Sequence, residues 1–290
     1  PSGGSRASDR VTIQPPTTPG QISVMPITLR LLLVLASLLL GPLVAMADEM
    51  PEDTNKIERL TPEQARKLVE TFPGVEAEVE FKFKRVGTIR RRNCLPLNGL
   101  KKLNAVTTHE LSQYDKGPLL LNGLTMLDAD TAKALARFKS DLLYLNGLTT
   151  LDAATAKALA DFKGEMLYLN GLTALDADTA KALAAFKGQV LGLSGLSTLD
   201  PATAKALADF KGESLYLGGL TTLDADTAKA IAEFKCQGLD LGGLTTLDAH
   251  TAKTLAEYKG TVRLRKTVEE SFFRKNPLNP ETALAWAALK

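Results

Sequence analysis

Residues 167–190 read LYLNGLTALDADTAKALAAFKGQV, and the middle of the chain consists of close copies of this stretch. A fixed period of this length is typical of repeat proteins, in which each copy forms one structural unit and neighbouring copies stack. The period predicts a solenoid of seven repeats over residues 95–260. One glycine recurs every 24 residues inside the pattern LxLxGLxxL, as Gly99, Gly123, Gly147, Gly171, Gly195, Gly219 and Gly243.

The first part of the copy predicts a short strand and a turn. Leu167 and Leu169 alternate with Tyr168, which is the pattern of a strand with two inward side chains and one outward side chain. Gly171 follows and is expected to permit a tight turn, because glycine has no Cβ atom.

The second part of the copy predicts a helix. Asp176 stands at the expected N-cap position. The copy at Asp200 supports this assignment, because Pro201 follows it at the first helical position, where proline is favoured. Residues 177–187 are good helix formers with one apolar face, and Gly188 is expected to end the helix in a left-handed conformation.

A single unit of this kind does not fold alone. It buries too few side chains to offset the conformational entropy that is lost when its backbone is ordered, so the copies must stack. Stacking would place short parallel strands on one side of the array and helices on the other. The expected fold class is therefore an α/β solenoid that is capped at both ends.

The pattern LxLxGLxxL resembles the strand segment of leucine-rich repeats, and it is most similar to repeat proteins that bacteria export. The resemblance covers residues 95–260 and implies a leucine-rich-repeat-like solenoid that binds or scaffolds. The chain departs from the family where the usual asparagine is replaced by leucines such as Leu172. Asparagines stand instead one residue after the strand, where they would either line a ligand groove or hydrogen-bond along the stack. They are Asn98, Asn122, Asn146 and Asn170.

An apolar run near the start predicts a signal peptide. Residues 31–47 carry no charge, follow Arg30 and end with the small residues Ala45 and Ala47 at a cleavage site. We expect translation to start at Met25, followed by cleavage after Ala47 and secretion or retention in the periplasm or cell envelope. The alternative is an uncleaved helix that anchors the protein in the membrane, because the run approaches the length of a span.

The segments beside the repeats are expected to be caps. Residues 48–57 predict a polar linker, and Thr61 followed by Pro62 predicts a helix start. Residues 75–84 alternate apolar and charged side chains, as in a half-buried strand with one charged face. A short strand is expected near 262–264 in the C-terminal cap. The predicted regions are a disordered or upstream segment 1–24, the signal peptide 25–47, the N-terminal cap 48–94, the repeats 95–260 and the C-terminal cap 261–290.

Composition argues against several classes of partner and site. The chain carries 35 Lys and Arg against 33 Asp and Glu, so no overall field favours nucleic acid. Lysine and aspartate columns repeat with the same period, which predicts mutual neutralisation on a solvated helical face. Cys94 and Cys236 lie about six coils apart, too far for a disulfide within the chain at about 4.8 Å per coil. We expect them to be free or paired between chains.

The search for catalytic chemistry is negative. His109 and His250 belong to different coils and cannot share a metal ion or a proton relay. The sequence contains no nucleophile elbow, phosphate-binding loop, HExxH or CxxC motif. We therefore expect a protein that is not an enzyme and that carries no catalytic residue, metal or cofactor.

The outward strand positions are the best candidates for binding. We expect them to form an exposed aromatic and aliphatic patch of the kind that protein partners use. A simpler interpretation is that the stacked tyrosines only stabilise neighbouring strands. The alternative function is a structural component of the cell envelope that self-associates or binds wall polymer or glycan. The patch comprises Leu142, Tyr144, Met166, Tyr168, Val190 and Tyr216.

Overall fold

The computed structural model describes residues 51–83, 86–265 and 287. All of them belong to one unit of the chain, residues 50–290. The predicted signal peptide, the upstream segment and most of the predicted C-terminal cap lie outside the described residues.

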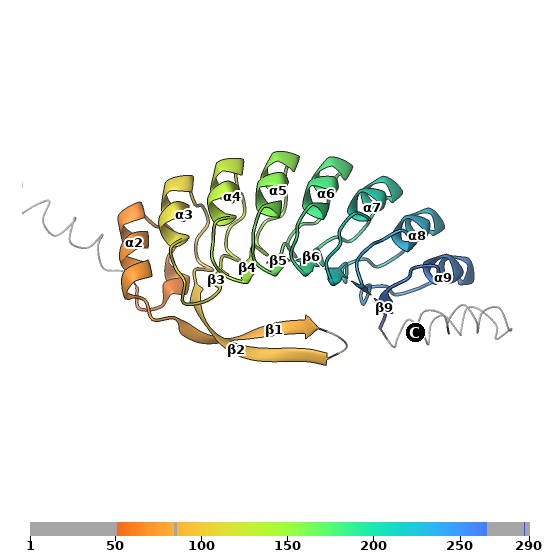
Figure 1. The fold of residues 1–290 in the computed structure, drawn as a ribbon, viewed down its shortest axis with the longest axis horizontal. Coiled ribbons are helices and arrows are strands. Elements are labelled where there is room, and N and C mark those ends of the chain that lie inside the picture. The colour runs from red at the N-terminus through yellow and green to blue at the C-terminus, as the bar shows by residue number, and fades with distance from the viewer. Residues whose placement is uncertain (1–50, 84–85, 266–286, 288–290) are drawn as a thin grey trace, which may run out of the picture. The chain divides into compact units, whose positions relative to one another are not determined.

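This unit is an α/β structure in which helices alternate with short strands (Figure 1). Its helical elements are η1 (Thr54–Lys56, a 3₁₀ turn), α2 (Pro62–Thr71), α3 (Ala105–Leu111), α4 (Ala129–Leu135), α5 (Ala153–Ala160), α6 (Ala177–Ala184), α7 (Pro201–Leu207), α8 (Ala225–Ala232) and α9 (Ala249–Leu255). Its strands are β1 (Val75–Phe83), β2 (Val86–Pro96), β3 (Leu119–Leu120), β4 (Leu142–Tyr144), β5 (Met166–Tyr168), β6 (Val190–Gly192), β7 (Ser214–Tyr216), β8 (Gly238–Asp240) and β9 (Thr261–Arg263).

The strands form one sheet whose order follows the chain from β1 to β9. β1 and β2 pair antiparallel, and every later neighbour pairs parallel. Equivalent residues of successive copies lie side by side, so Leu143 pairs with Leu167 and Leu167 with Leu191. The helices stand in a second row on the other side of the units (Figure 1). Strands on one side and helices on the other are as the sequence predicts.

The main core lies between the strand row and the helix row. The side chains that the repeat places inward, among them Leu167, Leu169 and Leu183, are completely buried there. Phe162, Phe186 and Phe210 stack in a continuous file, with ring centroids 6.3 and 6.4 Å apart. Each copy therefore buries its leucines and its ring against the copies before and after it.

The helices begin as predicted but end earlier. The Asp176 carboxylate accepts a hydrogen bond of 2.7 Å from the backbone N–H of Thr179, and Asp200 with Pro201 starts α7 in the same way. Helix α6 ends at Ala184, three residues before the predicted end. Gly188 is not left-handed, so its expected C-cap role is wrong. A Cβ atom there would lie 2.2 Å from Cζ of Phe186, so the glycine makes room for the ring.

The repeated glycine serves a close approach between coils. Gly171 lies in the predicted tight turn, which the Leu172 N–H closes with a 3.1 Å hydrogen bond to the carbonyl oxygen of Leu169, but its φ is not positive. A Cβ atom on Gly171 would lie 2.1 Å from the carbonyl oxygen of Asn146 and 2.7 Å from that of Leu148. The preceding coil's backbone therefore passes where any side chain would stand, and only glycine fits.

The predicted polar linker is part of the fold. Thr54 and Ile57 are buried, and the Thr54 hydroxyl donates a hydrogen bond to the carbonyl oxygen of Pro96. Asn55 accepts a 2.9 Å hydrogen bond from the side-chain amide of Asn98. Residues 54–71 therefore act as an additional coil that has no strand of its own at its start. Ile57 and Leu60 keep the spacing of Leu100 and Leu103, but Lys56 replaces the repeated glycine and the strand leucines are missing, so this coil escapes a search for the pattern LxLxGLxxL.

A hairpin is inserted into this additional coil. Asn55 and Asn98 are 43 residues apart, 19 more than the 24 that separate Asn98 from Asn122. The pairing of Val75 with Cys94 closes the hairpin β1–β2, so residues 75–93 account for the excess. The strand predicted over 75–84 is confirmed as β1, but Val75 itself is about half exposed, at 49%. The first half of a 24-residue unit therefore continues after the insertion.

Candidate binding face

The strands β4 to β7 bury side chains on two opposite faces. In β5, Leu167 belongs to the main core, whereas Met166 and Tyr168 belong to a separate cluster on the other face. The parallel register adds the equivalent residues of the neighbouring strands to each set. We call the second set the strand-face cluster; it comprises Leu142, Tyr144, Met166, Tyr168, Val190 and Tyr216.

Tyrosine rings hold the strand-face cluster together. The rings of Tyr144 and Tyr168 stack with centroids 4.7 Å apart and an interplanar angle of 8°. Tyr168 also approaches Tyr216, two strands away, with centroids 6.3 Å apart. Gly192 makes this possible, because a Cβ atom there would lie 2.5 Å from Cδ1 of Tyr168. The glycine in β6 therefore lets one ring lean across a strand to contact the next.

The residues come together as predicted, but the expectation that they are exposed is wrong. Leu142, Val190 and Met166 are 0%, 1% and 4% exposed, and Tyr168 and Tyr216 are also buried. Tyr144 is partly buried and packs against the others. Burial this complete requires a layer of atoms over the face. The repeat itself does not supply that layer, because its helices lie on the opposite side of the strands (Figure 1).

The hairpin β1–β2 runs along the strand side of the row, opposite the helices (Figure 1). Only its C-terminal end joins the parallel sheet, where Leu95 and Pro96 pair with Leu119 and Leu120. Among the described strands, β1 pairs with β2 alone. Most of the hairpin therefore shares no ladder hydrogen bonds with the repeats.

The strand face becomes polar toward the last coils. Tyr216 is followed in the register by Asp240, which is followed by Arg263. The Asp240 carboxylate accepts a 2.8 Å hydrogen bond from the backbone N–H of Gly242 and lies 3.4 Å from the Arg263 guanidinium. The face is therefore apolar from β4 to β7 and charged at β8 and β9.

The asparagine column forms a hydrogen-bonded ladder. The side-chain oxygen of Asn146 accepts a hydrogen bond of 2.9 Å from the backbone N–H of Asn170, and Asn170 does the same for Ser194. Asn98 and Asn122 continue the ladder toward the N-terminus, with distances of 3.1 and 3.2 Å. Of the two interpretations, the bonds support amides that hold neighbouring coils in register.

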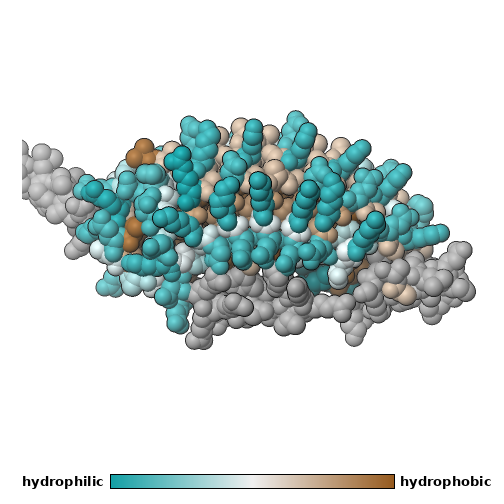
Figure 2. All heavy atoms as spheres, viewed as in Figure 1, coloured by the Kyte–Doolittle hydropathy of each residue, from teal (hydrophilic) through white to brown (hydrophobic). Residues whose placement is uncertain are grey.

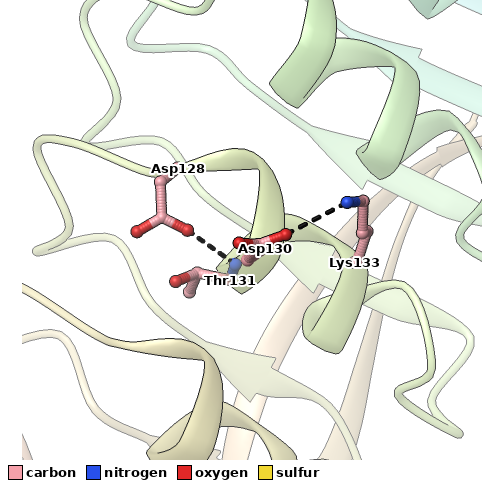
Figure 3. Close-up of polar contacts among 4 residues, drawn as sticks. All are labelled: Asp128, Asp130, Thr131 and Lys133. Carbon is pink, nitrogen blue, oxygen red and sulfur yellow. Dashed lines mark hydrogen bonds and ion pairs between the residues drawn. The ribbon is translucent and has the colours of Figure 1, made fainter.

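The helical side carries rows of polar side chains with apolar surface between them (Figure 2). In α4, Asp128 caps the helix by accepting from the backbone N–H of Thr131, and Lys133 lies 3.0 Å from Asp130 (Figure 3). The hydrogen bond from Thr131 lowers the pKa of Asp128. Exposed pairs of this kind contribute little to stability, so the face is a solvated surface in which charges offset each other.

The two thiols are buried and poor nucleophiles. Cys94 and Cys236 are free, and burial raises the pKa of both. The hydroxyl of Tyr258 donates a 2.7 Å hydrogen bond to the carbonyl oxygen of Cys236. Burial raises the pKa of Tyr258 as well. Burial likewise raises the pKa of Tyr114 to about 12. These groups stay protonated at neutral pH and serve packing.

Neither a metal site nor a membrane span occurs in the described part of the chain. Residues 51–83, 86–265 and 287 contain no group of three or more His, Cys, Asp or Glu arranged to hold a metal ion. Across the same ranges, no helix combines the length and hydropathy that crossing a bilayer requires.

Comparison with known proteins assigns no family. No protein-family model matches the chain, and no curated protein matches its sequence.

Proposed function

We propose that this chain is an exported, non-enzymatic repeat protein that binds a protein partner through its strand face. Within this proposal, the stacked units form a solenoid of the leucine-rich-repeat kind. The sequence motif, the parallel register and the coil-to-coil ladder support this assignment.

The observation that carries the proposal is the contrast between the two faces of the strands. The inward position holds leucine in every regular strand, from Leu143 to Leu239. The outward positions vary from copy to copy, so that Tyr144 and Tyr168 are followed by Gly192 and later by Asp240. If these positions served stacking alone, the same residue would be expected in every copy. A varied surface with a central aromatic cluster is the pattern of a recognition site.

The experiment is a binding measurement on the exported chain from residue 48 onward. The immobilised protein captures partners, which are cross-linked, identified and then purified for titration. Replacing Tyr144 and Tyr168 by serine should weaken binding of the purified partner at least tenfold, the loss expected of aromatic residues at the centre of an interface. Replacing Lys157 and Lys181 by serine, on the helical side, is the matched control and should leave affinity unchanged.

Other results would reject the proposal. Equal affinity of the tyrosine variant and the wild type would exclude the strand face as the binding site. Concentration-dependent self-association in light scattering, or saturable binding to wall polymer or a sugar array, would favour the structural or glycan-binding alternatives.

A further inference from the structure

The hairpin β1–β2 is an addition to a repeat that is otherwise complete without it. Gly74, the last residue before the insertion, and Gly117 hold the same position in successive coils, because they are 43 residues apart, as Asn55 and Asn98 are. Leu95, just after it, pairs directly with Leu119 of the next coil. Removing residues 75–93 would restore the 24-residue spacing between Asn55 and Asn98. The 24-residue spacing of the repeat therefore does not require the hairpin.

The position and sequence of the hairpin suit it to cover the strand-face cluster. The cluster is buried on the face away from the helices, and the hairpin is the described segment on that side of the row (Figure 1). Its first strand alternates apolar residues, such as Val79 and Phe81, with charged residues, such as Glu80. Alternation gives a two-stranded ribbon one face suited to an apolar surface and one suited to water.

We propose that the β1–β2 hairpin is an intramolecular occupant of the strand face, seated over the strand-face cluster, which a binding partner must displace. The displacement by a partner rests on the proposed function, whereas the seating of the hairpin over the cluster does not. Detachment requires little backbone rearrangement, because only Leu95 and Pro96 of the hairpin pair with the repeats. The base is fixed by the buried Cys94, whose thiol donates a 3.4 Å hydrogen bond to the carbonyl oxygen of Val75. The hairpin is thus joined to the repeats by backbone pairing at one end alone, among the described strands.

The deciding experiment is hydroxyl-radical footprinting of the full exported chain and of the same chain without residues 75–93. Deletion should increase labelling of Met166, Tyr168 and Tyr216 several-fold, because the proposed cover is removed. Tyr258 and Phe186, which belong to the main core, should be labelled equally in both proteins. Circular dichroism and a cooperative unfolding transition establish that the deleted protein is folded.

Point variants test the proposal in case the deleted protein does not fold. Replacing Val79 and Phe81 by aspartate should raise labelling of the cluster in the otherwise intact chain. Glu78→Lys with Glu80→Lys, which alters the alternate positions of the same strand, should not. Unchanged labelling in both the deletion and the aspartate variant would overturn the proposal. So would an increase seen only when the chain is cut after Arg265, because the cover would then be the C-terminal segment.

The same proteins separate this proposal from the proposed function. If the hairpin occupies the partner site, its deletion should tighten binding of the purified partner, since no displacement is then needed. Increased labelling with unchanged binding would keep the hairpin as the cover while rejecting the strand face as the partner site.

Discussion

Met166 and Leu167 are neighbours in one strand, and both are buried, but they belong to separate clusters on opposite faces of the strand. Leu167 is enclosed by its own coil and by the copies on either side, which carry leucine at the same place. Met166 packs with Leu142 and Val190 of the neighbouring strands, on the face opposite the helices. The comparison teaches that the repeat accounts for the burial of one face of the strand, whereas the second face needs a cover, which we propose is the unrepeated hairpin.

Truncation of the two side chains should separate these sources. Leu167→Ala should lower the free energy of unfolding by about 2 to 5 kcal/mol, because it leaves a cavity in the continuous core. Met166→Ala should cost less, about 1 to 2 kcal/mol, because the layer over it opens locally before the repeats unfold. Urea unfolding followed by circular dichroism measures both.

The comparison becomes sharper in the protein that lacks residues 75–93. There the cost of Leu167→Ala should be unchanged, whereas Met166→Ala should fall within the range of surface substitutions, about 0.5 kcal/mol. Equal costs for Met166→Ala in the two backgrounds would show that the hairpin does not bury this side chain.

Two adjacent glycines offer a matched test of the contact between coils. A Cβ atom on Gly219 would lie 2.2 Å from the carbonyl oxygen of Ser194, whereas one on Gly218 would have no neighbour closer than 3.6 Å. Gly219→Ala should therefore cost about 1 to 3 kcal/mol by overpacking. Gly218→Ala should change stability by about 0.5 kcal/mol or less. The difference in urea midpoints checks this, and similar midpoints would contradict the close approach.

The smallest expected effect concerns the repeated caps and pH. The backbone hydrogen bonds from Thr179 and Thr131 lower the pKa of Asp176 and of Asp128. The hydroxyl of Thr203, followed by its backbone N–H, lowers the pKa of Asp200. Because the folded-state pKa lies below the unfolded value, the caps stabilise fully above pH 4 or so and lose this effect as pH falls through the folded pKa. Asp176→Ala should cost about 1 kcal/mol at neutral pH, and Asp176→Asn much less.

Unfolding at a series of pH values measures this effect. Asp176→Asn should reduce the loss of stability in acid, because asparagine caps without titrating. A wild-type slope in the Asp176→Asn protein would contradict this expectation.

Much of the repeated structure follows from local patterns. Asp176 and Pro201 mark helix starts because a cap depends on residues within one turn. The alternation around Tyr168 places it opposite Leu167 and Leu169, because strand geometry has a period of two. The grouping of the six strand-face residues was predictable for the same reason, since identical copies 24 residues apart must lie side by side in register.

The sequence by itself therefore determined the repeating unit, the parallel register and the membership of the strand-face cluster. The tertiary structure decided three other features: the role of Gly171 as a place of close approach, the additional coil around Asn55, and the burial of the cluster. The physical reason is the separation along the sequence between the residues in contact. Repeated contacts recur at a fixed separation that can be read from the chain, whereas the cover of a face depends on where one segment without a period comes to rest.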